Sequence, residues 1–270
     1  MVAYFCSRFL SFYSRLFLIR EFQSCDLRLS SCFLTLQLFQ LKNMGTPAPI
    51  DKTATLTEAE YCQLADKAAE DVIALFEDKQ NWTATNYGDE IFTISTRKSE
   101  VKDAKESMLM LECELDLEPE KLETLLAPWG KYRLQWDDML EDATTIDSFG
   151  NDVYLLRHIV KKRISLSSRE SIDIVKVVRT QDRIIFASCG TSHNGYPPSK
   201  AHVRTHQYVG GYIIERLPHL RSKFTIIFHA DLNLPGPKLI ASLADRFKPR
   251  LVIENVKGLK DGIERFRAEL

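Results

Sequence analysis

The sequence predicts an α+β fold in which a curved antiparallel sheet wraps around a long C-terminal helix and leaves a tunnel between them. Short segments rich in β-branched and aromatic residues follow one another with brief turns, which is typical of antiparallel strands. A sheet of that many strands must bury one face against another layer. The end of the chain can supply that layer, because apolar residues recur there at intervals of four and three: Val252, Val256, Leu259, Ile263, Phe266 and Leu270.

The chain divides at about residue 55. Residues 1–55 form an N-terminal extension and linker, and residues 56–270 form the folded domain. The first 43 residues are rich in Phe, Leu and Ser and carry more arginine than acid, as organelle-targeting segments do. Three interpretations stay open: a cleaved leader, an interfacial or targeting segment, or a stretch upstream of a true start at Met44. The longest uncharged run, residues 29–41, is too short to cross a bilayer.

Composition excludes several classes of function. The 36 basic and 37 acidic side chains leave no excess charge of the kind that marks a nucleic-acid-binding protein. Six cysteines occur without a C-x-x-C pair, which argues against a zinc ribbon or a disulfide framework. We therefore expect no metal, no cofactor and a cytoplasmic protein, with mitochondrial targeting by the N-terminal segment as the alternative.

The elements follow in order. Thr57 and Glu60 form a capping-box pattern ahead of a helix that we expect to end near Asp78. Three strands come next, then two helical segments, "EPEKLETLLAP" and "KYRLQWDDML". A second run of strands extends from about Thr145 to "FTIIFHADL". A short helix with Leu239, Leu243 and Phe247 then precedes the terminal helix, whose first turn is expected to hold Pro249.

Motifs for catalysis are weak. Phosphate-binding and zincin motifs are absent from the sequence. Ser192 and His193 adjoin, but Asn194 stands where a nucleophile elbow needs its second glycine. The acidic residues Asp137, Asp138, Glu141 and Asp142 are expected to form the solvated face of a helix.

Polar side chains inside apolar strands are more informative. His158, Asp173 and His229 each interrupt a strand of otherwise apolar residues, and Asp231 follows at the end of the last strand. A buried polar group without a partner costs roughly 1–3 kcal/mol, so these side chains have partners or face something other than a dry core. For His158 and Asp173, each taken alone, a satisfied structural residue near a strand end is the favoured interpretation and a ligand contact is the alternative.

Four segments in the same order resemble the START family of lipid-transfer domains: "LQWDDMLEDATTID", "ISLSSRESIDIVKVV", "FASCGTSHNGYPPSKAHVRTHQYVGGYIIE" and "FTIIFHADLNLPGPKLIASL". The resemblance covers about residues 56–270. It is closest to the small single-domain members that bind sterols or bile acids, through "SRES" and "IFHADL". The phospholipid carriers share the "YPP…VR…GYII" portion, so the subgroup stays open. The resemblance implies a helix-grip fold that encloses a lipid tunnel.

The resemblance also implies which residues touch the ligand. Steroidogenic members carry a buried acid and an arginine where this chain has Leu156 and Val175, so recognition of a polar head group here must use other groups. Alternation along the strands then predicts inward-facing residues. The predicted ligand-binding residues are Tyr154, Leu156, His158, Asp173, Val175, Val177, Phe228 and His229. His229 is expected to donate a hydrogen bond to a ligand head group, and Asp231 to cap the following loop.

The expected function is non-catalytic: a monomer binds one amphipathic lipid, a sterol or related molecule, and carries it between membranes with transient contact to their surfaces. The loop of residues 161–168 and the apolar stripe of the C-terminal helix are expected to form a gate. The alternatives are a phospholipid carrier on the same fold, an enzyme on a helix-grip scaffold and a lipid sensor that transfers nothing. The sequence offers an enzyme only His158, Asp173 and His229.

Overall fold

A computed structural model of the protein describes residues 55–102, 104, 106–163, 166–234 and 241–270. The segment of residues 1–43 lies outside the described residues, as does Leu239, so the predictions for them stay predictions.

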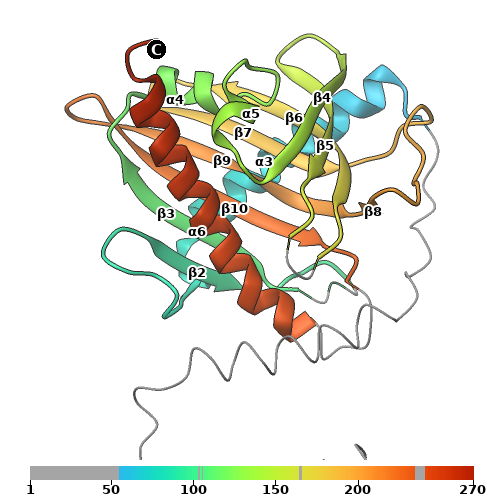
Figure 1. Ribbon diagram of the computed structural model, residues 1–270, viewed down its shortest axis with the longest axis horizontal. Coiled ribbons are helices and arrows are strands. Elements are labelled where there is room, and N and C mark those ends of the chain that lie inside the picture. Colours follow the sequence, from blue (N-terminus) through green and yellow to red (C-terminus); the bar gives the residue numbers. More distant parts are fainter. Residues whose placement is uncertain (1–54, 103, 105, 164–165, 235–240) are drawn as a thin grey trace, which may run out of the picture. The chain divides into compact units, whose positions relative to one another are not determined.

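One open sheet of ten strands forms the centre of the domain (Figure 1). Hydrogen-bonded neighbours follow the order β1-β2-β3-β10-β9-β7-β6-β5-β4, and the neighbouring pairs along this path are antiparallel, as predicted. The short strand β8 is the exception, because it pairs with β6 in parallel. The strands are β1 (Thr83–Ala84), β2 (Thr93–Arg97), β3 (Met108–Leu115), β4 (Leu140–Ser148), β5 (Val153–Val160), β6 (Arg169–Arg179), β7 (Arg183–Gly190), β8 (Val203–Arg204), β9 (His206–Leu217) and β10 (Arg221–Asp231).

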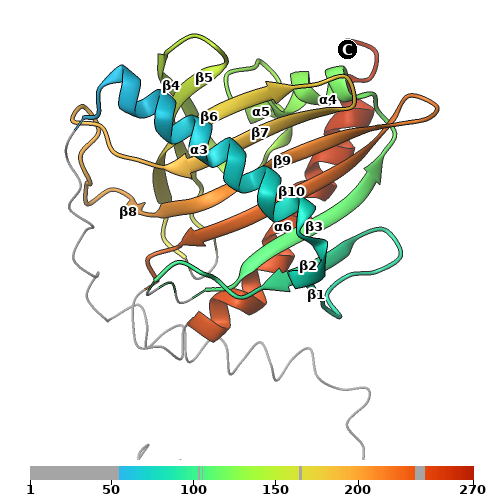
Figure 2. The ribbon, with the colours of Figure 1, turned by 180° about the vertical axis from the view of Figure 1, so that it is seen from behind.

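The first helix, α3 (Glu58–Glu77), begins with the predicted capping box. The Thr57 hydroxyl accepts from the Glu60 backbone N–H, and the Glu60 carboxylate accepts from the Thr57 backbone N–H at 2.7 Å. The helix lies across the sheet on the face opposite to the C-terminal helix (Figure 2). Its buried side, which includes Val72 and Phe76, packs on outward-facing residues such as Ile174 and Ile213. The sequence predicted this helix but not the sheet face that it covers.

Two short helices, α4 (Pro119–Leu126) and α5 (Arg133–Trp136), close one end of the domain. The prediction of a helix over the whole segment "KYRLQWDDML" was wrong, because helical structure there ends at Trp136. Asp137 accepts a hydrogen bond from the Met139 backbone N–H at 3.1 Å, which turns the chain into β4. Asp137 is also buried rather than solvated, and Glu141 and Asp142 lie on a strand.

The C-terminal helix α6 (Ala241–Phe266) crosses the inner face of the sheet (Figure 1). It is one helix with Pro249 inside it, so the prediction of a helix boundary at Pro249 was wrong. The predicted apolar stripe is confirmed. Val256, Leu259, Ile263 and Phe266 are buried in the inner core, and Val252 and Leu270 pack against it. Among the described helices, none is long and apolar enough to span a bilayer.

Two glycines set how closely α6 approaches α5. A Cβ atom on Gly262 would lie 2.6 Å from the Cβ of Trp136, and one on Gly258 would lie 3.2 Å from the Trp136 carbonyl oxygen. The indole is itself fixed, because its Nε1 donates to the Leu125 carbonyl at 2.8 Å. The helix backbone therefore rests directly on Trp136 at this point.

This contact generates a test of Gly262. In an isolated helix, alanine is favoured over glycine by about 1 kcal/mol. Here we expect Gly262→Ala to lower the free energy of unfolding by about 1–3 kcal/mol, because overpacking forces the helix or Trp136 to shift. Urea denaturation measures the change. Gly258→Ala, with its longer contact, is the matched comparison and should cost less. A Gly262→Ala protein more stable than the unmodified chain would show that the contact between α6 and Trp136 has room for an added methyl group.

Candidate functional site

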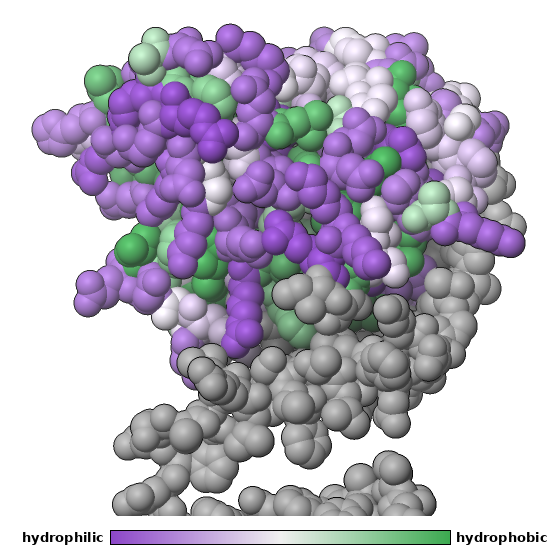
Figure 3. All heavy atoms as spheres, in the orientation of Figure 1, coloured by the Kyte–Doolittle hydropathy of each residue, from purple (hydrophilic) through white to green (hydrophobic). Residues whose placement is uncertain are grey.

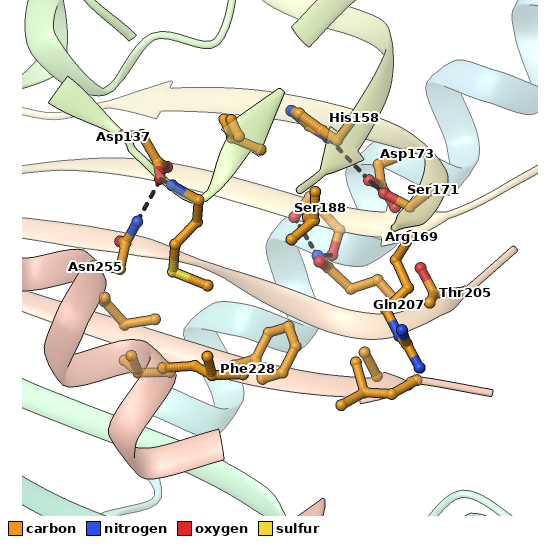
Figure 4. Close-up of a pocket in the computed structure, with 18 of the residues that line it drawn as sticks. Asp137, His158, Arg169, Ser171, Asp173, Ser188, Thr205, Gln207, Phe228 and Asn255 are labelled. Atoms are coloured by element: carbon orange, nitrogen blue, oxygen red, sulfur yellow. Dashed lines mark hydrogen bonds and ion pairs between the residues drawn. The ribbon is translucent and has the colours of Figure 1, made fainter. Parts of the chain in front are cut away.

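A cavity of about 300 Å³ lies between the inner face of the sheet and α6 (Figure 4). Strands β5, β6, β7, β9 and β10 and the helix all contribute to its walls. Apolar residues form most of the wall: Met139, Val160, Val175, Phe186, Ile226, Phe228, Leu232, Leu251 and Val252. Polar side chains interrupt it along β6 and its neighbours: His158, Arg169, Ser171, Asp173, Ser188, Thr205 and Gln207. The space lies where the sequence predicted a tunnel.

Four of the predicted ligand-binding residues line this cavity. They are His158, Asp173, Val175 and Phe228. Antiparallel pairing explains why they meet. His158 lies opposite Ser171, and Leu156 lies opposite Asp173, so alternate residues of β5 and β6 point to the same side.

Three others lie on the same face of the sheet but pack into the core. Leu156 and Val177 are buried in the inner apolar cluster. Tyr154 is covered by Trp129, with ring centroids 3.7 Å apart. These three side chains are not among the described residues that line the cavity.

His229 lies elsewhere. Adjacent residues of β10 point to opposite faces, so His229 points away from the side on which Phe228 lines the cavity. It pairs with Val209, which packs in the cluster under α3. Its side chain is fully buried, and burial followed by the charge of Lys248 lowers its pKa to about 4. The predicted hydrogen bond from His229 to a ligand has no support in this geometry.

A polar cluster of His158, Ser171 and Asp173 lies on the sheet side of the cavity (Figure 4). The Oδ2 atom of Asp173 lies 3.1 Å from the His158 Nδ1 atom and accepts from the Ser171 hydroxyl at 2.6 Å. Beside it, the Gln207 amide donates to the Ser188 carbonyl at 3.2 Å. Asp173 lies opposite Leu156 on the neighbouring strand and two residues from Val175 on its own strand. Leu156 and Val175 are the positions at which, by the resemblance, other members carry a charge pair.

A second polar group, which the sequence did not predict, also lines the cavity. Arg133 and Asp137 form a buried ion pair with a 2.8 Å contact, and both side chains line the cavity. Tyr212 and Asn255 complete it. Arg133 donates to the Tyr212 hydroxyl at 3.1 Å, and the Asn255 amide donates to Asp137 at 3.0 Å. The i, i+4 spacing of Arg133 and Asp137 was a usable signal, but the acidic residues that follow made a solvated helix face the simpler interpretation.

The loop predicted as a gate borders the cavity. Lys161, Arg163, Leu166 and Ser167 line it from one side, and Lys248, Leu251, Val252 and Asn255 of α6 line it from the other. Arg163 and Glu254 join the two sides through a 2.8 Å ion pair at the surface.

Asp231 and the Ser192–His193 pair can be placed directly. Asp231 accepts from the Asn233 backbone N–H at 2.7 Å, so its predicted role as a cap is confirmed.

Ser192 and His193 are not among the described residues that line the cavity.

The buried His229 generates a pH prediction. Its folded-state pKa of about 4 lies below its usual value of 6.5, so the unfolded chain binds more protons between these pH values. The stability that it contributes is therefore present above pH 6.5 and is lost as the pH falls toward 4, by an amount on the order of 3 kcal/mol. Urea denaturation from pH 7 to pH 4 measures it.

The control for this prediction is the exposed His219 at the β9–β10 turn. His229→Gln should flatten the pH dependence, whereas His219→Gln should leave it unchanged. Equal slopes for the His229→Gln protein and the unmodified chain would contradict the assignment.

Comparisons with known proteins agree with this architecture. The family model described as the START domain matches residues 63–262. The chain also resembles the solved structure of human StAR-related lipid transfer protein 5, with a TM-score of 0.71 and 22% identity over 78% of this chain and 100% of that one. Human STARD10 matches with a TM-score of 0.66 and 17% identity, over 81% of this chain and 84% of that one.

More distant likenesses share the fold. A StAR-related lipid transfer protein fragment from Xanthomonas axonopodis matches with a TM-score of 0.56 and 14% identity, over 68% of this chain and 99% of that fragment. No curated protein matches the sequence. The family model spans more than half of the chain, and its helix-grip arrangement of sheet and C-terminal helix is the one described above. The chain therefore belongs to the START domain family.

Proposed function

We propose that this domain binds one amphipathic lipid, a sterol or a related molecule, in the cavity under α6 and carries it between membranes without changing it chemically. The observation that carries this proposal is the cavity itself, which has mainly apolar walls and a compact polar cluster in a START domain. Two of the similar solved structures have the words "lipid transfer protein" in their names, which supports the same function.

The residues divide into three roles. His158 and Asp173 offer hydrogen bonds to a polar group of the ligand, and Val175 and Phe228 contact its apolar body. Tyr154, Leu156 and Val177 pack in the inner core beside the residues that line the cavity. Transient contact with a membrane surface and a monomeric state belong to the same proposal, and so does a cytoplasmic location.

Apolar burial supplies the driving force. Removing apolar surface from water stabilises a complex by about 25 cal/mol per Å², less the cost of ordering the gate. The face of the domain that carries α6 is mainly hydrophilic, with only small hydrophobic areas between polar side chains (Figure 3). A ligand's apolar body is therefore better accommodated inside the cavity than on this surface.

A phospholipid carrier is the closest alternative. A volume of about 300 Å³ is at the lower end of the range of about 300–1,000 Å³ usual for ligand pockets. That size favours one compact ring system over a lipid with two acyl chains, which would require the cavity to widen.

The arrangement of the polar cluster argues against a serine hydrolase. A hydrolase needs a nucleophile within hydrogen-bond reach of a general base. Here Ser171 donates to Asp173, and His158 contacts Asp173 rather than the Ser171 hydroxyl. The serine is therefore not activated by the histidine.

The test of this function is native mass spectrometry of the full chain purified from a eukaryotic host, with identification of the extracted lipid. We expect one sterol-sized lipid per protein, and transfer of labelled sterol from donor to acceptor liposomes. Val175→Arg, which places an unpaired charge in the wall, should lower ligand occupancy, and Val175→Ala is its uncharged control. Binding without transfer would indicate a sensor. A protein that carries no lipid and takes up neither sterol nor phosphatidylcholine would contradict the proposal.

Release of an enclosed ligand requires movement of a gate. The predicted gate was the loop of residues 161–168 with the apolar stripe of α6, but of that stripe only Val252 is among the described residues that line the cavity, so we assign the gate to the loop and the cavity-lining part of α6. The Arg163–Glu254 ion pair links the loop to the helix, and both side chains are partly exposed. Exposed pairs of this kind contribute about 0.2–1 kcal/mol. A link of that strength can hold the gate closed and still break readily.

We therefore expect Glu254→Gln to raise the rate of ligand exchange by about two- to fivefold with little loss of thermal stability. Stopped-flow displacement of a fluorescent sterol measures the rate. Glu264→Gln is the matched control, because Glu264 lies on the same helix and pairs with Arg267 away from the cavity. An equal effect of the two substitutions would rule out a specific role for the Arg163–Glu254 pair.

A further inference from the structure

Strand β6 presents two buried charged side chains of opposite sign to the cavity. Arg169, Ser171, Asp173 and Val175 alternate along its inner face, and each lines the cavity (Figure 4). Asp173 is 3% exposed and Arg169 is 8% exposed. Charges buried to this extent are normally paired and fully hydrogen-bonded, so the partners of each one matter.

Asp173 has an unused acceptor. His158 and Ser171 both contact its Oδ2 atom, whereas the buried Oδ1 atom has no hydrogen-bond partner among the residues that the structure describes. An unsatisfied buried oxygen of this kind favours any donor group that enters the cavity. A ligand hydroxyl meets that requirement.

Arg169 has an uncompensated charge. Its Nη1 atom donates to the Ser167 carbonyl, but its Nε atom has no hydrogen-bond partner, and no carboxylate pairs with it within the described part of the chain. The two other arginines that line the cavity differ, because Arg133 pairs with Asp137 and Arg163 pairs with Glu254. An arginine cannot lose its proton in a protein, so burial of Arg169 favours an anion beside it.

We propose that the ligand is an acidic amphipath whose carboxylate, sulfate or phosphate pairs with Arg169 and whose hydroxyl donates to Asp173. This inference rests on the proposed function and narrows its ligand class. Arg169 and Asp173 are four residues apart on one strand, which corresponds to about 13 Å along β6. A rigid body that carries an acid at one end and a hydroxyl toward the other fits this spacing. A neutral sterol satisfies only Asp173 and leaves Arg169 unpaired.

Three probes that share a steroid skeleton separate the two contacts in the full-length protein. Lithocholic acid carries both an acid and a hydroxyl, 5β-cholanic acid carries only the acid, and cholesterol carries only the hydroxyl. Displacement of a fluorescent sterol measures each affinity. We expect lithocholic acid to bind most tightly, by about tenfold or more over either of the others, since charge-assisted hydrogen bonds are the stronger kind.

Substitutions assign each contact. Arg169→Gln should weaken both acids about tenfold or more and leave cholesterol unchanged. Asp173→Leu should weaken lithocholic acid and cholesterol and leave cholanic acid unchanged. Arg157→Gln is the control for loss of a partly buried arginine, because Arg157 pairs with Glu170 and does not line the cavity. Thermal melting of each variant checks that it folds, and Arg169→Lys, which keeps the charge, should retain part of the affinity for acids.

The outcomes separate this inference from the proposed function. Vesicles that contain phosphatidic acid are a further probe. If the protein binds these vesicles and Arg169→Gln abolishes the binding, the anion that pairs with Arg169 is a phosphate. Cholesterol bound as tightly as lithocholic acid, with no effect of Arg169→Gln, would overturn the acidic ligand class and leave lipid binding intact. Failure of every probe and of native lipid extraction would remove the proposed function as well.

Discussion

The contact between α6 and Trp136 is the constraint on which the cavity depends. Gly258 and Gly262 let the C-terminal part of the helix rest on α5, and the buried stripe from Val256 to Phe266 packs against the inner core. The preceding part of the helix, from Lys248 to Asn255, instead forms a wall of the cavity. The helix is therefore packed in the core along its C-terminal part and borders the cavity along the part before it, so the proposed gate would move at the cavity-lining part.

Strand β6 contributes to both sides of the sheet, because its successive side chains point to opposite faces. Glu170 points to the α3 side, where it pairs with Arg157 and Arg204 at 2.7 Å each and ties β6 to β5 and β8. Arg169 and Ser171, its immediate neighbours, point into the cavity. The segment "SRES" therefore serves structure and ligand contact with alternate residues. A shift of register by one residue would exchange those roles and bury Glu170 in the apolar wall.

The sequence predicted features that depend on local periodicity. The antiparallel strands, the capping box of α3 and the stripe of α6 follow from spacing and residue type, and so do the two inward-facing rows, one with His158 and one with Asp173. Prediction from the sequence failed where tertiary contacts determine the local structure. Asp137 is buried because it pairs with Arg133, and it ends the helix through its bond from the Met139 backbone N–H. His229 lies on the far face because the register, rather than residue type, fixes its direction. The unpartnered atoms of Arg169 and Asp173 could not be predicted, since a missing partner is visible only when all neighbours are placed.

The charges around the cavity are unequally compensated, and this has a thermodynamic consequence. The Arg133–Asp137 pair is satisfied within the protein, with Tyr212 and Asn255 completing it, so a ligand gains little by approaching it. Arg169 lies beside the gate loop, to which its Nη1 atom is bonded at Ser167, and has no such compensation. An anion that pairs with Arg169 would remove the free-energy cost of burying this unpaired charge in the ligand-free protein. Ligand binding and stability are then linked, because a ligand that binds only the folded state raises the free energy of unfolding as its concentration increases. If the loop of residues 161–168 is the gate, as proposed, loss of the ligand at a membrane would restore the uncompensated charge next to that loop and so weaken the closed state there.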